Sequence, residues 1–185
     1  MDKRQIAFEL LNNELAKEGL YLNIICVGGY VLEYYGLRST QDVDAFYEEN
    51  QRIRELIFKV GQKLALNTSE ELWLNNSVAN LNPLPPIEYC EVLYSFENLT
   101  VYVVSLDYVL GMKLTSVRDQ DLKDVGEIIK HKRLRSPFAL YERLVKMGFA
   151  SLDFAYILDG FHLAYGMDWL RDFFGKNQEE LRRYY

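Results

Sequence analysis

The stretch Ile24 to Tyr47, IICVGGYVLEYYGLRSTQDVDAFY, decides the fold of this chain. It begins inside an apolar run, residues 22–27, which predicts a buried strand that stops at the pair Gly28-Gly29. Residues 30–35 predict one short helix, because Gly36 follows them and glycine commonly ends helices. The first half of the stretch is therefore a strand, a glycine pair and a helix.

The second half of the stretch carries the charges. A basic and hydroxylated turn, Arg38-Ser39-Thr40, leads into a second predicted strand through Asp42-Val43-Asp44. Side chains at positions i and i+2 of a strand point to the same face, about 7 Å apart. Asp42 and Asp44 therefore present two carboxylates to one place, where they repel each other unless a cation lies between them.

These residue types favour a metal beside a phosphate. Mg²⁺ takes one or two carboxylates and completes its octahedron with water and substrate phosphates. Gly28 and Gly29 have no Cβ atoms, so a phosphate can approach the backbone, and the start of the following helix favours an anion. Together the features suit phosphoryl or nucleotidyl transfer, in which positioning and charge neutralisation dominate catalysis. Each feature also has a simpler interpretation: a solvated strand edge, a turn, and a surface salt bridge of Arg38.

The segment GGYVLEYYGLRSTQDVD, residues 28–44, resembles the signature of nucleotidyltransferases with the polymerase-beta-type fold. The form R-x-T-x-D-V-D, followed by a lysine-bearing helix and the segment RDQDLKD at 118–124, is most similar to the bacterial AbiEii-like and related nucleotidyltransferases. The resemblance covers residues 20 to 130, and several of those proteins are toxins of toxin–antitoxin or phage-defence systems. It implies an α/β fold with a mixed sheet flanked by helices.

The resemblance also implies roles for individual residues. Asp42 and Asp44 would hold Mg²⁺ or Mn²⁺, and the bound nucleoside triphosphate would contact Gly28, Gly29, Arg38, Thr40 and Lys113. Enzymes of this type have a third carboxylate on a nearby strand. Predicted strands cover 87–94 and 99–104, and the first of them offers Glu88 and Glu91. Of the two, Glu91 is our candidate for the third acid, although neither glutamate stands at a motif-like position and a solvated strand glutamate is the simpler interpretation of both.

Lys113 can also be judged without the resemblance. The predicted helix 106–117 has apolar residues at i, i+3, i+4, i+8 and i+11, and Lys113 lies at i+7 on the same stripe. A charge on an apolar stripe is costly unless it is paired. The partner is either the aspartate pair or a bound phosphate, unless the lysine extends to solvent at the helix rim. Asp121 and Asp124 are candidates for holding Lys113 or Arg118 in place.

The rest of the chain predicts further helices at 2–18, 50–66, 118–130, 137–147, 151–165 and 168–185, with Asp119 as a possible N-cap and Gly175 as an interruption of the last. A short strand at 72–74 lies in an otherwise irregular segment, 70–86. We expect a nucleotidyltransferase-like domain over residues 1–130 and a helical extension over 131–185.

Composition narrows the function classes. The net charge is −6, from 21 basic and 27 acidic residues, which argues against a broad surface for binding duplex nucleic acid. No apolar run reaches the length of a membrane span, and the N-terminus does not read as a signal peptide. Cys26 and Cys90 lie in apolar runs and are expected to be reduced core residues of a cytoplasmic protein.

The sequence thus predicts a Mg²⁺-dependent transfer of a nucleoside monophosphate from an NTP to an RNA end, a protein or a small molecule. An antitoxin partner is a further expectation from the resemblance. The alternative is a degenerate member that binds nucleotide or a partner protein without turnover, which the lack of a clear third carboxylate favours.

Overall fold

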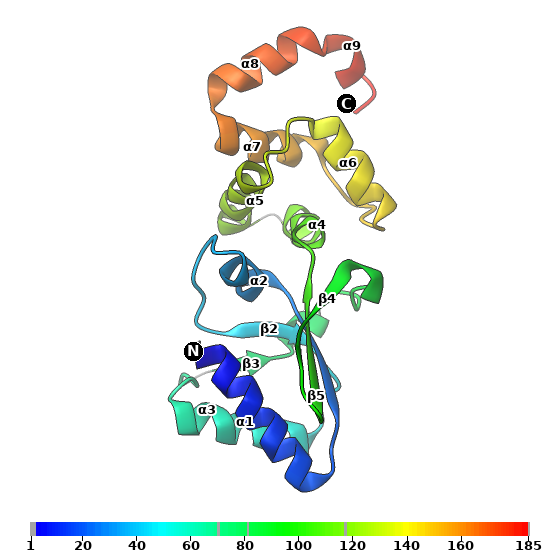
Figure 1. The fold of residues 1–185 in the computed structure, drawn as a ribbon. Coiled ribbons are helices and arrows are strands. Elements are labelled where there is room, and N and C mark those ends of the chain that lie inside the picture. Colours follow the sequence, from blue (N-terminus) through cyan, green and yellow to red (C-terminus); the bar gives the residue numbers. More distant parts are fainter. Residues whose placement is uncertain (1–2, 70, 81, 117, 185) are drawn as a thin grey trace. The chain divides into compact units, whose positions relative to one another are not determined.

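The computed structural model describes residues 3–69, 71–80, 82–116 and 118–184, and it divides into two compact units, residues 1–105 and 106–185 (Figure 1). The boundary lies directly before the helix that carries Lys113, whereas the sequence-based division placed it at residue 130. No helix among the described residues is long and apolar enough to cross a membrane.

In the described part of the first unit, five strands form a mixed sheet in the order β3-β2-β1-β5-β4. The strands are β1 (Leu22–Cys26), β2 (Val43–Phe46), β3 (Leu74–Asn75), β4 (Cys90–Ser95) and β5 (Leu99–Val104). β1 runs parallel to β5 and antiparallel to β2, β2 runs parallel to β3, and β4 runs antiparallel to β5. The mixed sheet predicted from the sequence is confirmed.

The helices of the first unit are α1 (Lys3–Glu18), α2 (Gly28–Tyr34) and α3 (Gln51–Leu64), with the 3₁₀ turns η1 (Ser77–Asn80) and η2 (Ile87–Tyr89). α3 begins where the side chain of Asn50 accepts a hydrogen bond from the backbone N–H of Ile53, 2.9 Å away. Its apolar stripe is buried and consists of Ile53, Leu56, Ile57 and Val60. The strand predicted over 87–94 begins later in the structure, at Cys90, because residues 87–89 form a 3₁₀ turn.

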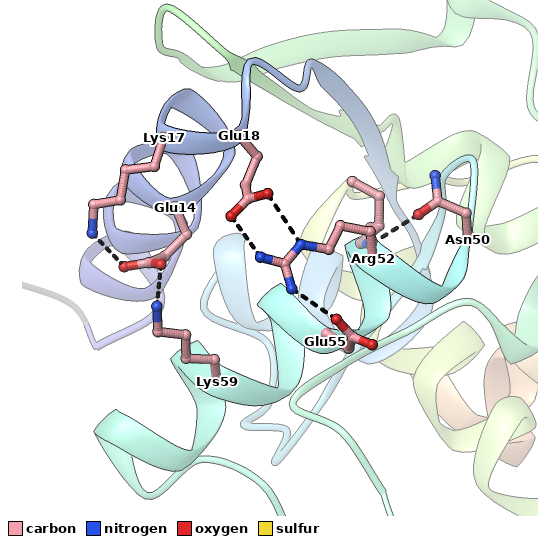
Figure 2. Close-up of polar contacts among 8 residues, drawn as sticks. Glu14, Lys17, Glu18, Asn50, Arg52, Glu55 and Lys59 are labelled. Carbon is pink, nitrogen blue, oxygen red and sulfur yellow. Dashed lines mark hydrogen bonds and ion pairs between the residues drawn. The ribbon is translucent and has the colours of Figure 1, made fainter.

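A network of charges joins α1 to α3 on the surface (Figure 2). Glu14 accepts hydrogen bonds from Lys17 and from Lys59 of α3, and Arg52 of α3 lies between Glu18 and its own helix neighbour Glu55. Below this network the apolar face of α1 is buried, with Ala7, Phe8, Leu11 and Leu15 fully covered.

The core face of the sheet carries side chains with no solvent exposure, namely Ile24, Cys26, Val43, Ala45, Leu74, Val101 and Val103. Both cysteines are free thiols, as predicted. Cys26 belongs to the core, and burial raises its pKa. Cys90 is only partly buried at the start of β4, so its assignment to the core is wrong, and partial burial raises its pKa to about 11.

The second unit is helical, with α4 (Leu106–Ser116), α5 (Asp119–His131), α6 (Pro137–Lys146), α7 (Phe154–Tyr165), α8 (Met167–Lys176) and α9 (Gln178–Leu181). Arg118, not Asp119, is the N-cap of α5. α8 continues through Gly175 to Lys176, and the side chain of its C-cap Asn177 donates to the backbone oxygen of Phe173 at 2.7 Å. The predicted interruption at Gly175 is therefore wrong by two residues.

Candidate functional site

The glycine pair lies against the second aspartate. β1 ends at Cys26, the backbone N–H of Val27 donates to the carbonyl oxygen of Asp44 at 2.9 Å, and α2 begins at Gly28. Gly28 has a φ of +61°, which is strained for any residue with a side chain. A Cβ atom on Gly28 would lie 3.3 Å from Oδ2 of Asp44. Glycine here lets the backbone turn into α2 while the carboxylate lies directly against it.

Gly29 is packed against the basic turn. A Cβ atom at this position would lie 2.9 Å from Nη2 of Arg38 and 3.0 Å from Oγ1 of Thr40. The absent side chain therefore makes room for the protein's own guanidinium and hydroxyl groups. This contact explains why the pattern needs glycine here, and it brings Arg38 and Thr40 to the start of α2.

Asp42 is held by neutral donors on both carboxylate oxygens. The hydroxyl of Thr40 donates to Oδ1 at 3.1 Å, and the side-chain amide of Asn75 donates to Oδ2 at 3.3 Å. Thr40 is itself fixed, because its backbone N–H donates to Oε2 of Glu33 in α2 at 2.7 Å. Asp42 and Asp44 are both partly exposed, so the carboxylates are oriented and still open to solvent.

A buried arginine supports the turn from behind. Arg4 of α1 is 6% exposed, and its Nη2 donates to the backbone oxygen of Thr40 at 3.1 Å and also to that of Gln41. These carbonyls directly precede Asp42. The guanidinium group thus fixes the entry of the chain into β2, using a charge placed on the apolar stripe of α1.

The donor set fits a hard divalent cation that keeps part of its shell for water and substrate. Asp42 and Asp44 supply two carboxylates, and hydroxyl and amide groups rather than cations are seen on Asp42. Within the described ranges, no group of three or more His, Cys, Asp or Glu side chains forms a ready metal cage. Two carboxylates suit Mg²⁺, which demands few protein ligands when phosphate oxygens are present.

Glu91 lies elsewhere in the first unit. It is on β4, and β1 and β5 separate that strand from β2. With about 4.8 Å between neighbouring strands, the backbones of β2 and β4 are roughly 14 Å apart. The hydroxyl of Tyr35 donates to Glu91 at 2.9 Å, and burial together with this bond raises the pKa of Tyr35 to about 12. Glu88, the other candidate, is in the turn η2.

Strand pairing also places Glu91 on the other face of the sheet. Glu91 is opposite Val103, Val103 opposite Cys26, and Cys26 opposite Ala45. Directly paired residues share a face, and Asp44, one residue before Ala45, points to the opposite face. The structure does not bring Glu91 together with the aspartate pair, and its catalytic role stays a prediction.

Lys113 is paired within the second unit. Its Nζ lies 2.7 Å from Asp121 Oδ1 and 2.6 Å from Asp124 Oδ2, and the three side chains are at most 9% exposed. Burial alone would raise the pKa of Asp121, but hydrogen bonds from Lys113 and Ser116, with the charges of Lys113 and Arg118, hold it below its usual value. The structure therefore shows Lys113 paired with Asp121 and Asp124.

A cavity of about 480 Å³ begins beside Asn75 in the first unit. Its walls come from α3 and from the segment after it, and they are rich in amides and hydroxyls, including Asn67, Thr68 and Ser77. Phe58 contributes a ring that is half exposed. The cavity therefore offers polar groups and one aromatic surface close to the residue that holds Asp42.

A family model described as "Nucleotidyltransferase of unknown function (DUF6036)" matches residues 5–146. The chain belongs to this family. The match of the nucleotidyltransferase model spans the aspartate pair, the glycine pair, the basic turn and the Lys113 cluster. No curated protein and no solved structure gave a match. The nucleotidyltransferase assignment is therefore confirmed, and closeness to AbiEii-like toxins stays a prediction.

Three residues that hold the turn and the aspartate pair in place were not predicted: Arg4, Glu33 and Asn75. Arg4 had a signal, because it lies on the apolar stripe of α1 as Lys113 does on that of α4. Glu33 and Asn75 had none, since each is placed by a turn or a strand pairing that the sequence does not specify.

Proposed function

We propose that the first unit carries the reaction centre of a nucleotidyltransferase that uses Mg²⁺ or Mn²⁺ to move a nucleoside monophosphate from an NTP to an acceptor hydroxyl. The supporting observation is that residues predicted for this chemistry from one stretch of sequence meet in space. These residues are Gly28, Gly29, Arg38, Thr40, Asp42 and Asp44. Membership of a nucleotidyltransferase family supports the same reaction class.

In the proposed reaction the acceptor oxygen attacks the α-phosphorus, and the bond from that phosphorus to the oxygen bridging the α- and β-phosphates breaks. Pyrophosphate leaves, and the acceptor proton passes to solvent or to a nearby base. A divalent cation held by Asp42 and Asp44 would neutralise charge on the phosphates and on the leaving group. Arg38 would contribute positive charge beside Gly29.

Lys113 is proposed to bind phosphate as part of the second unit. Its two carboxylate partners, Asp121 and Asp124, hold the ammonium group in one orientation. Lys113 and the two aspartates together carry a net negative charge, which Arg118 neutralises through its ion pair with Asp121. Arg118 is 80% exposed and donates to Asp121 at 3.0 Å, so it is the accessible cation of the group. Phosphate binding would then draw on Lys113 and Arg118 together.

The acceptor is proposed as an RNA end, a protein hydroxyl or a small molecule. The net charge of −6 favours an acceptor recognised locally, and the cavity beside Asn75 supports a pocket for a nucleoside or another compact polar group. A toxin–antitoxin or phage-defence role stays a prediction. Growth arrest on expression of the wild type, absent with the Asp42→Ala/Asp44→Ala variant, would support it.

A binding protein without turnover is the second candidate. The observation that favours it is the strand order, which separates Glu91 from the aspartate pair within the described first unit. Such a protein would bind an NTP and release it unchanged.

The test compares the wild type with Asp42→Ala/Asp44→Ala. Each protein is incubated with Mg²⁺, each α-labelled NTP in turn, and total cellular RNA or protein. Glu97→Gln is the matched control, because it removes an exposed acid from the hairpin between β4 and β5. Label transferred by the wild type and the control but not by the double variant supports the enzyme. NTP binding by calorimetry without transfer supports the binding protein.

A further inference from the structure

The neighbour of the aspartate pair on the adjacent strand is uncharged. β3 runs parallel to β2, with Asn75 directly opposite Asp44. Directly paired residues of neighbouring strands project to the same face, so Asn75 shares a face with Asp44. Asn75 is thus the residue that β3 adds to the carboxylates of β2.

The orientation of the Asn75 carboxamide is fixed by the next turn. Its Oδ1 accepts from the backbone N–H of Ser77 at 3.3 Å and from the hydroxyl of Ser77 at 2.6 Å. A backbone N–H can only donate, so the oxygen of the amide must face Ser77. The NH₂ group therefore faces Asp42, whose Oδ2 lies 3.3 Å away. Asn75 turns a donor, not an acceptor, toward the metal-binding carboxylate.

This donor sets the charge of the site. A carboxylate at position 75 would bring a third negative charge beside Asp42 and Asp44, which a second divalent cation could then bridge. Two divalent cations about 3.5–4 Å apart repel strongly and need several anionic ligands between and around them. With an amide at this position β3 adds no third carboxylate to Asp42 and Asp44, and two carboxylates suit one divalent cation.

Resting on the function proposed above, we propose that Asn75 is a positioning residue that orients Asp42 and restricts the site to one tightly bound divalent cation. A second cation, if the reaction uses one, arrives only with the phosphates of the substrate. The amide also keeps Asp42 hydrogen-bonded when no cation is bound, so Asp42 stays in place before the cation arrives.

The experiment titrates Mn²⁺ into the full chain without nucleotide and follows the free-ion signal by electron paramagnetic resonance. Asn75→Asp is the decisive variant, because its carboxylate can still accept both hydrogen bonds from Ser77 and changes only the side that faces Asp42. Asn75→Ala removes both the hydrogen bond to Asp42 and the hydrogen bonds from Ser77. Asn80→Asp is the matched control, since it adds the same charge to an exposed residue lining the same cavity.

The proposal expects one Mn²⁺ per wild-type chain and two per Asn75→Asp chain, with the first ion bound about tenfold more tightly in the variant. Asn75→Ala should bind its single ion 10- to 100-fold more weakly, as is usual when the hydrogen-bond partner of a metal ligand is lost. Asn80→Asp should behave as the wild type.

Two results would overturn the inference and leave the proposed function intact: a wild type that binds two ions with similar affinity, or Asn75→Asp that binds as the wild type does. The wild-type stoichiometry decides even if a variant fails to fold. A wild type that binds no Mn²⁺ in the millimolar range without nucleotide would also overturn the inference, whereas the proposed function would fall only if Mn²⁺ did not bind in the presence of an NTP either.

Discussion

The hydroxyl oxygen of Thr40 lies 3.1 Å from Oδ1 of Asp42, so the turn before β2 directly orients the first aspartate. We expect Thr40→Val to lower the transfer rate by about 10- to 100-fold, because the carboxylate of Asp42 loses one of its two hydrogen-bond partners. Thr40→Ser keeps the hydroxyl and should restore most of the rate. The measurement is label transfer at saturating NTP, with Thr100→Val on β5 as a control for the loss of a hydroxyl elsewhere in the sheet. Equal rates for Thr40→Val and the control would contradict the role of Thr40.

Gly28 and Gly36 form a matched pair for testing the contact with Asp44. Both have positive φ, +61° and +72°, so alanine at either costs about 1–2 kcal/mol in backbone strain. Only at Gly28 would the new Cβ approach Asp44 Oδ2, at 3.3 Å, whereas nothing lies within 4 Å at Gly36. We expect similar losses of thermal stability, with Mn²⁺ binding and transfer impaired only in Gly28→Ala. Impairment of both functions by Gly36→Ala to the same degree would show that strain alone is responsible.

The Lys113 cluster is predicted to stabilise the second unit. Lys113→Ala removes the ammonium group that lies against the buried Asp121 and Asp124, and breaking a buried ion pair in this way typically costs about 3–5 kcal/mol. Arg118→Ala removes a largely exposed partner of the same Asp121 and should cost less than about 1 kcal/mol. Hydrogen–deuterium exchange of α4 and α5 measures the difference locally. Similar protection of α4 and α5 in both variants would contradict the structural importance of Lys113.

The lowered pKa of Glu14 predicts that the protein loses stability in acid. Hydrogen bonds from Lys17 and Lys59 lower its pKa from 4.5 to about 2. Because the folded-state pKa is depressed, the stabilisation is present above pH 4.5 and is lost as the pH falls toward 2. Glu14→Gln should therefore lower the melting temperature at pH 7, and this deficit should shrink as the pH falls from 4.5 toward 2. Melting curves across this range test the prediction, and a deficit that stays constant over the range would contradict the charge-based cause.

Much of the site could be predicted because it is local in sequence. The strand, the glycine pair, the short helix and the aspartates of β2 lie within residues 24–47, and each is specified by hydrophobic pattern or by glycine. The same reasoning found α3, α4 and α6; in the structure α6 has Ser136 as its N-cap, which accepts from the N–H of Ala139 at 3.2 Å.

The rest depends on strand pairing, which local patterns do not encode. The sequence does not say which strand lies next to β2, so it does not show which acidic residue can reach Asp42 and Asp44. The strand order β3-β2-β1-β5-β4 places Asn75, not Glu91, beside these two aspartates. The apolar stripe indicates that Lys113 needs a partner for its charge. The carboxylates that pair with it lie on the next helix, so the pattern alone does not choose among the possible partners. Arg4 could have been found by that same rule.

The most direct test of the central claim, that the Asp42/Asp44 site transfers a nucleotidyl group, is a comparison of labels on one NTP. The wild type is given the preferred nucleotide labelled at the α-phosphate or at the γ-phosphate, with Mg²⁺ and the acceptor fraction. We predict that α-label joins the acceptor, that γ-label appears only in pyrophosphate, and that Asp42→Ala/Asp44→Ala does neither. Transfer of γ-label to the acceptor, or undiminished transfer of α-label by the double variant, would contradict the claim.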